Sequence, residues 1–455
     1  MWTYTLNQIA KCCDGQVVGD GTLTVSGVFT DSRVDGAKRI FVALGGDNFD
    51  GHDFVNHAAS NGAAAVLVSR PVPNVAIPQI VVADTLAGLT DFATFHRTTF
   101  KKQVAAVTGS AGKTTTRSLL ATVLRTTGKV LEPEKNFNNH IGVPLTVLNL
   151  DNSYDAAVFE LGCSGFNEIG PLTQIVAPHV ALITNVGKAH LENLKNLEGV
   201  ARAKGELFLA QRPDGCAILN ADDPWIMKMP RCAERVITFS ASGNDADVIL
   251  LERTPSPSGQ RLKIKIKDEI LDVKFALPGI HNAVDATAAA AAALAMGTPV
   301  ADIKRGLASA KAYPGRFNIL DKQGICIIDD TYNANPSSMT ASLNVLSEMV
   351  AASHRMAVLG DMLELGDDSV LAHREIGKVA AGLHLKQLFV TGNYAEEVKT
   401  GAVLNGMPAE NIVCDDNVDK IVKKVLEISK SGDALLIKGS RGMKLERVVH
   451  AILEG

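Results

Sequence analysis

A glycine-rich segment at residues 108–115 has the residue types and spacing of a phosphate-binding loop. It follows an apolar run at residues 104–107 and precedes a stretch whose apolar side chains recur on one helical face. A strand, a loop and a helix in this order direct backbone N–H groups and the positive end of the helix dipole at one point, which favours an anion. Lys113 is then placed to reach the β- and γ-phosphates of a nucleotide, and the Thr114 hydroxyl to bind Mg²⁺. The loop residues expected at the nucleotide are Gly109, Ser110, Ala111, Gly112, Lys113, Thr114 and Thr115.

The loop departs from the common Walker pattern, because Val107 stands where that pattern has its first glycine. The alternative interpretation is a chance Gly-Lys-Thr turn without a ligand. A strand before the loop and a helix after it are the context that a phosphate loop requires, and both favour the nucleotide interpretation.

The elements that must position this loop belong to an α/β protein of several domains. The chain has 455 residues, whereas one hydrophobic core rarely grows beyond about 250–300 residues. Short apolar runs alternate with helical patterns, which is typical of strands buried on both faces of a parallel sheet. The runs lie at residues 104–107, 156–159, 180–183, 217–219, 325–328, 356–359, 388–390 and 434–437.

Two breaks in the pattern predict three domains, at residues 1–100, 101–313 and 314–455. The first break precedes the strand of the loop, and the second is a Tyr-Pro-Gly turn after a long helical region. Alternating apolar and polar residues between 245 and 275 predict antiparallel strands with one wet face. The alanine-rich run at residues 286–296 is too short to span a bilayer and predicts a buried helix.

Composition and charge restrict the class of protein. Apolar residues make up 46% of the chain and charged residues 21%, which is the balance of a soluble globular protein. A net charge of −4 argues against a nucleic-acid-coating protein, because such a protein needs a basic face. The seven cysteines are odd in number and lack metal-binding spacing, and the first residues lack the pattern of a signal peptide. We therefore expect reduced thiols in a cytoplasmic protein with no integral membrane segment.

Glu160, His190 and Lys204, which all follow the loop in the sequence, are candidates for a metal site. Each of them also has an interpretation without a metal. Glu160 ends an apolar run, and ligand crevices of open α/β sheets lie at the carboxyl ends of strands. A solvated glutamate at a strand end is the alternative. His190 on its own would be typical of a surface or a helix start, and Lys204 of an exposed helix face.

The loop variant T-G-x-x-G-K-T-T, the strand ending in E-L-G and the segment N-V-x-x-A-H-L-E together resemble the Mur ligase superfamily. Its members, the muramyl peptide ligases and folylpolyglutamate synthases, form amide bonds through an acyl phosphate. The resemblance implies a small UDP-binding α/β domain and a C-terminal Rossmann-like α/β domain. Between them it implies a central phosphate-loop domain, with a parallel sheet, helices on both faces and a small antiparallel sheet. The C-terminal domain is expected to take the amino-acid or dipeptide acceptor and to close on ATP.

The resemblance also implies the cofactors, which are ATP and two Mg²⁺ ions. The expected metal-site residues are Thr114, Glu160, His190 and Lys204, with Lys204 as an N6-carboxylysine. CO₂ adds only to a neutral amine, so such a site must lower the pKa of the lysine or trap the carbamate on the metal. The catalytic residues implied are Lys113, Glu160, His190, Lys204 and Arg316.

Further contacts follow from the same resemblance. His281 and Asn282 of the G-x-H-N segment are expected at adenine and ribose, although Asn282 also suits a helix cap. Arg316, otherwise a surface arginine, would offset charge at the γ-phosphate. The remaining expected contacts are Asp330 and Asn335 at the nucleotide and Ser32, Arg33, Asn138 and Asn139 at the UDP substrate. The chain departs from the usual pattern at Asp285 and Cys163.

The segment D-D-T-Y-N-A-N-P-S-S-M at residues 329–339 is similar to that of superfamily members that add D-alanyl-D-alanine to UDP-N-acetylmuramoyl-tripeptide. This likeness implies a monomer with small-molecule substrates, acting in peptidoglycan precursor synthesis, and leaves the third peptide residue open between diaminopimelate and lysine. One alternative is a sister ligase with another acceptor, such as glutamate. A phosphate-loop NTPase switch or motor and a non-catalytic binding module are the others.

Overall fold

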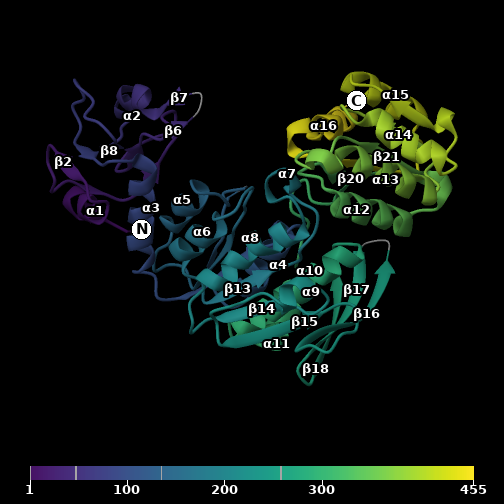
Figure 1. Ribbon diagram of the computed structural model, residues 1–455, viewed down its shortest axis with the longest axis horizontal. Helices are drawn as coiled ribbons and strands as arrows, with labels where there is room; N and C mark the ends of the chain where they lie inside the picture. Colours follow the sequence, from purple (N-terminus) through teal and green to yellow (C-terminus); the bar gives the residue numbers. More distant parts are fainter. Residues whose placement is uncertain (1, 47–48, 135, 257–258, 455) are drawn as a thin grey trace.

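The computed structural model describes residues 2–46, 49–134, 136–256 and 259–454 and shows three α/β domains in a bent row (Figure 1). The N-terminal domain lies at one end, the central domain in the middle and the C-terminal domain at the other end. Each domain is organised by its own sheet. No helix in the described ranges is long and apolar enough to cross a membrane.

The N-terminal domain has a five-stranded sheet in the order β2-β9-β8-β5-β4, in which only the β2–β9 pair is antiparallel. Its strands are β1 (Tyr4–Thr5), β2 (Gln16–Val18), β3 (Thr24–Val25), β4 (Val28–Phe29), β5 (Ile40–Val42), β6 (Gly45–Gly46), β7 (Phe49–Asp50), β8 (Ala65–Val68) and β9 (Gln79–Val81). Its helices are α1 (Leu6–Cys12), α2 (Val55–Ser60) and α3 (Thr85–Arg97), with a 3₁₀ turn at Gly51–Phe54.

The N-terminal domain is packed firmly on the central domain. The buried Arg97 at the end of α3 donates from its guanidinium to the carbonyls of Val176 (2.6 Å) and Ala177 (3.0 Å) in the central domain. The indole N–H of Trp2 donates to the carbonyl of Leu148 at 2.5 Å. A single apolar cluster runs through both domains. The two therefore share one core, although each has its own sheet.

The central domain has a nine-stranded sheet in the order β11-β12-β10-β13-β14-β15-β16-β17-β18. The pairs from β11 to β16 are parallel, and the last two pairs are antiparallel. Its strands are β10 (Gln103–Thr108), β11 (Val130–Leu131), β12 (Ala156–Glu160), β13 (Val180–Ile183), β14 (Cys216–Asn220), β15 (Arg235–Ser240), β16 (Val248–Ser256), β17 (Gly259–Ile266) and β18 (Glu269–Phe275). The predicted antiparallel strands are thus present, and they extend the parallel sheet rather than forming a separate one.

Helices cover both faces of the central sheet. Alternate residues of β12 belong to different apolar clusters, Ala157 and Phe159 to one and Ala156 and Val158 to the other, as the alternation of a strand requires. The alanine-rich helix α10 is buried along nearly its whole length, and its small side chains allow close contact with α4. The helices are α4 (Lys113–Leu124), α5 (Gly142–Val147), α6 (Ile169–Val176), α7 (Leu191–Leu194), α8 (Leu197–Ala210), α9 (Pro224–Met227), α10 (Ile280–Ala295) and α11 (Val300–Ala308).

The C-terminal domain has a six-stranded sheet in the order β19-β20-β24-β21-β22-β23, parallel except for the β19–β20 pair. Its strands are β19 (Asn318–Lys322), β20 (Ile325–Asp330), β21 (Arg355–Leu359), β22 (Gln387–Val390), β23 (Ile412–Cys414) and β24 (Ala434–Lys438). Its helices are α12 (Pro336–Met349), α13 (Ser369–Gly382), α14 (Ala395–Leu404), α15 (Val418–Ile428) and α16 (Glu446–Glu454). All eight apolar runs predicted as strands lie in strands of the structure.

Two glycines of α13 provide a test of packing in the C-terminal domain. A Cβ on Gly377 would lie 1.9 Å from the Val398 carbonyl oxygen of α14, whereas a Cβ on Gly382 would have nothing within 4 Å. Gly377→Ala is expected to lower the free energy of unfolding by about 1–3 kcal/mol, because the two helices must separate. Gly382→Ala is expected to leave it within about 0.5 kcal/mol. Urea unfolding followed by circular dichroism measures both, and equal effects would contradict the close helix contact.

Candidate active site

The loop between β10 and α4 has a backbone that requires its glycines. Gly109 and Gly112 have φ angles of 149° and 77°, in the region that favours glycine. A Cβ on Gly109 would lie 1.9 Å from Thr184 Oγ1, and one on Gly112 would lie 2.3 Å from Asp285 Oδ1. The loop therefore fits closely against its neighbours, with the N-terminus of α4 at its end.

The segment after β13 supports the loop from behind. The Thr184 hydroxyl donates to the carbonyl of Ala111 at 2.6 Å, and Asn185 Oδ1 accepts from the Ala111 N–H at 3.0 Å. The Ser110 hydroxyl donates to the carbonyl of Gly187 at 3.0 Å. Sequence reasoning missed both residues, although Asn185 begins the segment N-V-x-x-A-H-L-E and Thr184 directly precedes it. Their hydrogen bonds fix the loop before any ligand arrives.

Lys113 is a partly buried cation that lacks a carboxylate partner among the described hydrogen bonds. Its Nζ donates to the carbonyl of Gly109 at 2.7 Å. Burial, with the nearby Lys204 as a further cause, lowers the pKa of Lys113 to about 8, although Glu160 opposes the shift. A phosphate beside the ammonium group would stabilise its charged form, so the site is suited to an anion.

Lys204 lies on α8 with 1% of its surface exposed, so the alternative of an exposed helix face is wrong. Burial lowers its pKa, and its Nζ lies 3.9 Å from Cys163 Sγ. A lowered pKa increases the fraction of neutral amine, which is the form that reacts with CO₂. The environment of Lys204 is therefore suited to a carbamate.

Glu160 is the last residue of β12 and is buried, so the alternative of a solvated strand end is wrong too. Its Oε1 accepts from Asn138 Nδ2 at 2.9 Å, and its Oε2 lies 3.6 Å from Nε of Arg117. Arg117 is fully buried one helical turn after Lys113, and it also pairs with Glu132. Sequence reasoning missed Arg117, although its spacing from Lys113 places both on one face of α4.

His190 lies at the start of α7 with a left-handed φ of 53°. Its Nδ1 is 2.5 Å from Oε2 of Glu364 in the C-terminal domain, and this contact lowers the pKa of Glu364. His190 and Lys113 line one cavity of about 170 Å³, together with residues of the C-terminal domain. The histidine is therefore at the junction of two domains rather than on a free surface.

The side chains available as metal ligands near the loop determine which metal ion could bind there. The described residues hold no group of three or more His, Cys, Asp and Glu side chains placed for a metal ion. Mg²⁺ prefers oxygen ligands, and Glu160 and the Thr114 hydroxyl provide them. A carbamate on Lys204 would add the second anionic oxygen group. The residues present therefore fit Mg²⁺ when Lys204 is carboxylated.

A second cavity, of about 350 Å³, lies beside the loop between the central and C-terminal domains. His281 lines it, and its Nδ1 is buried without a hydrogen-bond partner among the described residues. Burial lowers the pKa of His281 to about 4, so its ring is neutral at neutral pH. Asn282 donates to the carbonyl of Pro278 at 2.7 Å and does not cap α10, which leaves its Oδ1 as an acceptor.

Asp285 lies under the loop and is 5% exposed. Its Oδ1 accepts from the Thr116 hydroxyl at 3.1 Å and is close to Gly112. Burial raises the pKa of Asp285 to about 7, although the Thr116 hydrogen bond and Arg316 oppose the shift. This carboxyl group therefore supports the loop from the side of α10.

Two residues bring the C-terminal side of the molecule to the loop. Arg316 NH2 donates to the Thr114 hydroxyl at 3.3 Å, and its guanidinium lies 4.0 Å from the ring centre of Tyr332. Asn335 Nδ2 donates to the carbonyl of Ser110 at 3.5 Å, while its Oδ1 caps α12. The domains are thus closed on the loop in this structure.

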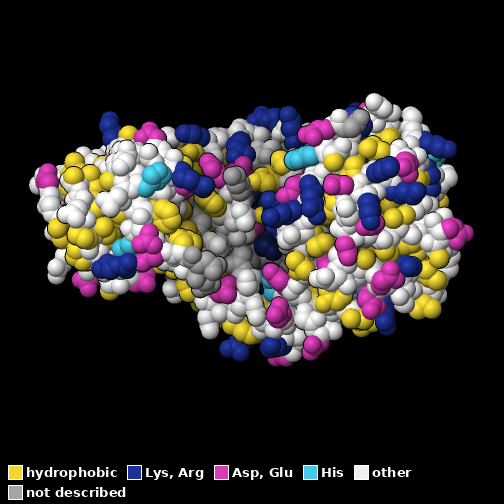
Figure 2. Space-filling model, turned by 90° about the horizontal axis from the view of Figure 1, so that it is seen from above, with side chains coloured by type: hydrophobic (Ala, Val, Ile, Leu, Met, Phe, Trp, Pro, Cys, Tyr) yellow, Lys and Arg dark blue, Asp and Glu magenta, His cyan; other side chains and the backbone are white. Residues whose placement is uncertain are grey.

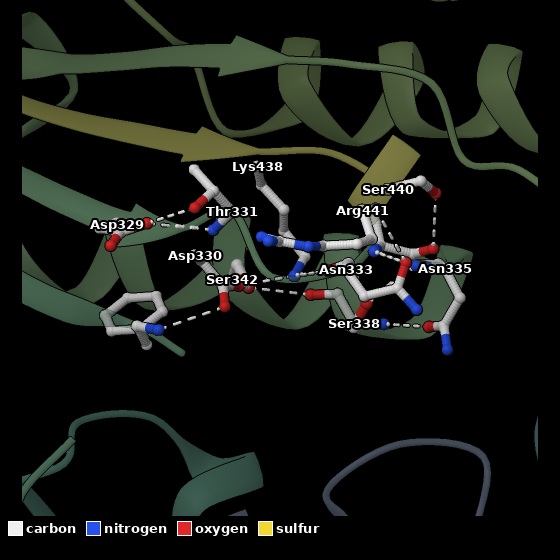
Figure 3. Close-up of polar contacts among 12 residues, drawn as sticks. Asp329, Asp330, Thr331, Asn333, Asn335, Ser338, Ser342, Lys438, Ser440 and Arg441 are labelled. Atoms are coloured by element: carbon white, nitrogen blue, oxygen red, sulfur yellow. Dashed lines mark hydrogen bonds and ion pairs between the residues drawn. The ribbon is translucent and has the colours of Figure 1, made fainter. Parts of the chain in front are cut away.

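Asp330 is held by groups from two elements and from the residue before β19 (Figure 3). Lys438, which is opposite Asp330 in the β20–β24 register, donates to Asp330 Oδ2 at 2.7 Å. The Ser342 hydroxyl of α12 donates to the same oxygen at 2.6 Å, and the Phe317 N–H donates to Oδ1 at 3.2 Å. Asp330 lines the larger cavity in this fixed orientation.

The residues expected at the UDP substrate belong to two domains. Asn138 contacts Glu160, but Asn139 Oδ1 accepts from the Gly142 N–H at the start of α5. Ser32 Oγ is 3.1 Å from His57 Nδ1, and the exposed Arg33 pairs with Asp31 at 2.7 Å. Ser32 and Arg33 thus belong to the N-terminal domain, between β4 and β5.

Positive side chains gather near the middle of the molecule. Figure 2 shows Lys and Arg side chains beside the hollow between the two ends of the row. Lys113, Arg316 and Arg441 line the two cavities at the junction of the central and C-terminal domains. An anionic ligand would therefore find favourable charge at this place.

Comparison with known proteins identifies the family. The Mur ligase family catalytic domain matches residues 24–94, the Mur ligase middle domain residues 107–293, and the Mur ligase glutamate ligase domain residues 315–441. UDP-N-acetylmuramoyl-tripeptide–D-alanyl-D-alanine ligase from Escherichia coli (strain K12) is 35% identical over 457 aligned positions, covering 100% of this chain and 99% of that protein. The chain belongs to the Mur ligase family.

Solved structures of Mur ligases have the same fold. MurF from Acinetobacter baumannii matches with a TM-score of 0.92 and 32% identity, over 100% of both chains. MurF ligase from Thermotoga maritima, in complex with ADP, matches with a TM-score of 0.84 and 29% identity, over 94% of this chain and 97% of that one. These comparisons confirm the three-domain α/β fold that the sequence of this Mur ligase predicts.

The raised pKa of Asp285 predicts an unusual dependence of stability on pH. The folded protein keeps a proton that the unfolded chain loses above about pH 4, so stability falls as pH rises from about 4 to about 7. Asp285→Asn removes this loss, and we expect it to raise the free energy of unfolding by about 2 kcal/mol at about pH 8 and much less at about pH 5.

Urea unfolding at both pH values measures this difference. Asp268→Asn, in the exposed turn between β17 and β18, is the matched control and should follow the wild-type pH dependence. An equal effect of Asp285→Asn at both pH values would contradict a protonated Asp285.

Proposed function

We propose that this Mur ligase joins D-alanyl-D-alanine to UDP-N-acetylmuramoyl-tripeptide and converts ATP to ADP and phosphate. Two observations about Lys113 of the phosphate loop carry the proposal. The charges of Glu160 and the buried Lys204 act on Lys113, and His190 lines one cavity with Lys113 at the junction of two closed domains. The full-length likeness to the Escherichia coli ligase supports the choice of substrates.

The reaction divides into two steps. The terminal carboxylate of the tripeptide attacks the γ-phosphate of ATP, which gives an acyl phosphate and releases ADP. The amine of the dipeptide then attacks the activated carbonyl carbon, and the tetrahedral intermediate expels phosphate as the amide bond forms. Each step moves negative charge near the loop, so electrostatic stabilisation by fixed groups is the main task of the protein.

Two cations take part in the first step. Lys113 lies inside the loop, and Arg316 reaches the Thr114 hydroxyl from the other side. Together they would hold the γ-phosphate between the domains and offset its charge during transfer. Arg316 directly precedes the C-terminal sheet, and closure of that domain would also exclude water from the acyl phosphate.

The residues that would hold Mg²⁺ are Thr114, Glu160, His190 and a carboxylated Lys204. The ions would supply charge neutralisation on the phosphate oxygens. Asn138 orients Glu160 by its amide hydrogen bond, and Arg117 provides positive charge beside the same carboxylate. The chain itself thus fixes the direction of the metal-site carboxylate.

The smaller cavity is suited to the acceptor. It is lined by Ser440 and Arg441 of the C-terminal domain and by Lys113 of the loop. A guanidinium such as that of Arg441 can pair with the terminal carboxylate of a dipeptide.

The larger cavity, with His281 and Asp330, would take adenine and ribose. We also propose that the enzyme works as a monomer in the cytoplasm and on small molecules only.

Phosphate release from MgATP tests the proposed reaction. We expect release only when both the UDP-muramyl tripeptide and D-alanyl-D-alanine are present, since the tripeptide carboxylate forms the acyl phosphate and the dipeptide amine then expels phosphate from it. Lys113→Ala is expected to reduce the rate at least about 100-fold, because it removes the cation at the phosphates. Lys101→Ala, at an exposed site before the same strand, is the control and should leave the rate unchanged.

Two outcomes would contradict the proposal. Phosphate release that ignores the dipeptide would favour an NTPase, and release that requires glutamate instead would favour a sister ligase. Substantial turnover by Lys113→Ala would remove the role proposed for the loop.

A second test addresses Lys204. The carboxylated lysine is expected to disappear on removal of CO₂ and to return with bicarbonate, and activity should follow. Mass spectrometry of the intact protein should detect one added carboxylate group on the wild type and none on Lys204→Arg, because the guanidinium does not become neutral. Full activity of Lys204→Arg would contradict the carbamate.

A further inference from the structure

His190 is contacted by a carboxylate that belongs to another domain. Nδ1 of His190 lies 2.5 Å from Oε2 of Glu364 and has no other polar partner among the described residues. The contact leaves Nε2 as the ring nitrogen available to a metal ion. Histidines that bind metals usually give their second nitrogen to a carboxylate or a carbonyl, which fixes the tautomer and the orientation of the ring.

The segment that carries Glu364 is held rigidly within the C-terminal domain. The Met362 N–H donates to His373 Nε2 at 2.9 Å, and the Leu363 N–H donates to Ser440 Oγ at 2.9 Å. Glu364 itself has a φ of 65°, and His190 has a φ of 53°. Non-glycine residues keep such angles only where their surroundings determine them. Both partners therefore have backbone conformations that their surroundings determine, and the segment of Glu364 is held by its own domain.

The same two segments touch at other points. Lys188 Nζ lies 2.8 Å from Asp368 Oδ2, and Gly366 lies against the backbone of Glu192. Both side chains of the Lys188–Asp368 pair are about half exposed, so this pair contributes little to affinity between the domains. It differs from the His190–Glu364 pair in having no connection to the proposed metal site, which makes it a matched control.

We propose that Glu364 is a positioning residue for His190, so that the metal site of the central domain is completed by the docked C-terminal domain. The proposal rests on the proposed function, because Glu364 can position a metal ligand only if His190 binds Mg²⁺. Its consequence is an order of events: the C-terminal domain must dock before the metal site reaches full affinity. Phosphoryl transfer therefore requires that the C-terminal domain, which takes the acceptor, has docked.

The test is metal binding by the full-length protein without turnover. Mn²⁺ is titrated by electron paramagnetic resonance in the presence of the β,γ-methylene analogue of ATP. Glu364→Ala is expected to weaken Mn²⁺ binding by about 10-fold or more, in the range found for residues that orient metal ligands. Glu364→Gln keeps an oxygen that accepts from Nδ1–H and should recover part of the affinity. Asp368→Asn should stay within about 2-fold of the wild type.

Three results would overturn the proposal. They are unchanged Mn²⁺ affinity in Glu364→Ala, an equal loss in Asp368→Asn, and absence of Mn²⁺ binding by the wild-type protein. Small-angle scattering of each variant with the analogue reports domain closure separately, and Glu364→Ala that closes normally but binds Mn²⁺ weakly is the supporting result. The assay contains neither muramyl substrate nor dipeptide, so failure of dipeptide-dependent phosphate release would refute the proposed function alone.

Discussion

Buried positive charge around the phosphate loop is the constraint on which the rest of the structure depends. Lys204 and Arg117 are buried there and Lys113 is partly buried, and the carboxylates that lie close to these three cations in the described contacts are Glu160 and Glu132. Burying unbalanced charge is costly unless it is paired. The site therefore favours anions, and a nucleotide and a carbamate on Lys204 would both supply them.

Most of the fold could be predicted, because its signals are local. The apolar runs are short and bounded by turns, and each became a strand. The alternation in β17 placed Leu262, Ile264 and Ile266 inside, as a strand with one wet face requires. The joining of β16–β18 to the parallel sheet was not predicted, because strand pairing at a sheet edge depends on tertiary geometry and leaves no local pattern.

Only some residues of the site could be predicted, because others come from segments that lie far from the loop in the sequence. The loop residues are contiguous, so one motif located them. Thr184 and Asn185 support the loop from a different strand, and Lys438 reaches Asp330 from more than a hundred residues away. Such contacts follow from parallel register and not from spacing. The departure at Asp285 was noticed in the sequence, but its position beneath Gly112 required the structure.

The two ends of the molecule are attached to its middle in different ways. The N-terminal domain shares an apolar core with the central domain, and Arg97 ties the two backbones together. The C-terminal domain meets the central domain largely through polar and charged contacts at the cavities. A shared core resists bending, whereas polar contacts can exchange with water. The N-terminal and central domains therefore form one stiff body, and a hinge between domains would have to lie on the C-terminal side.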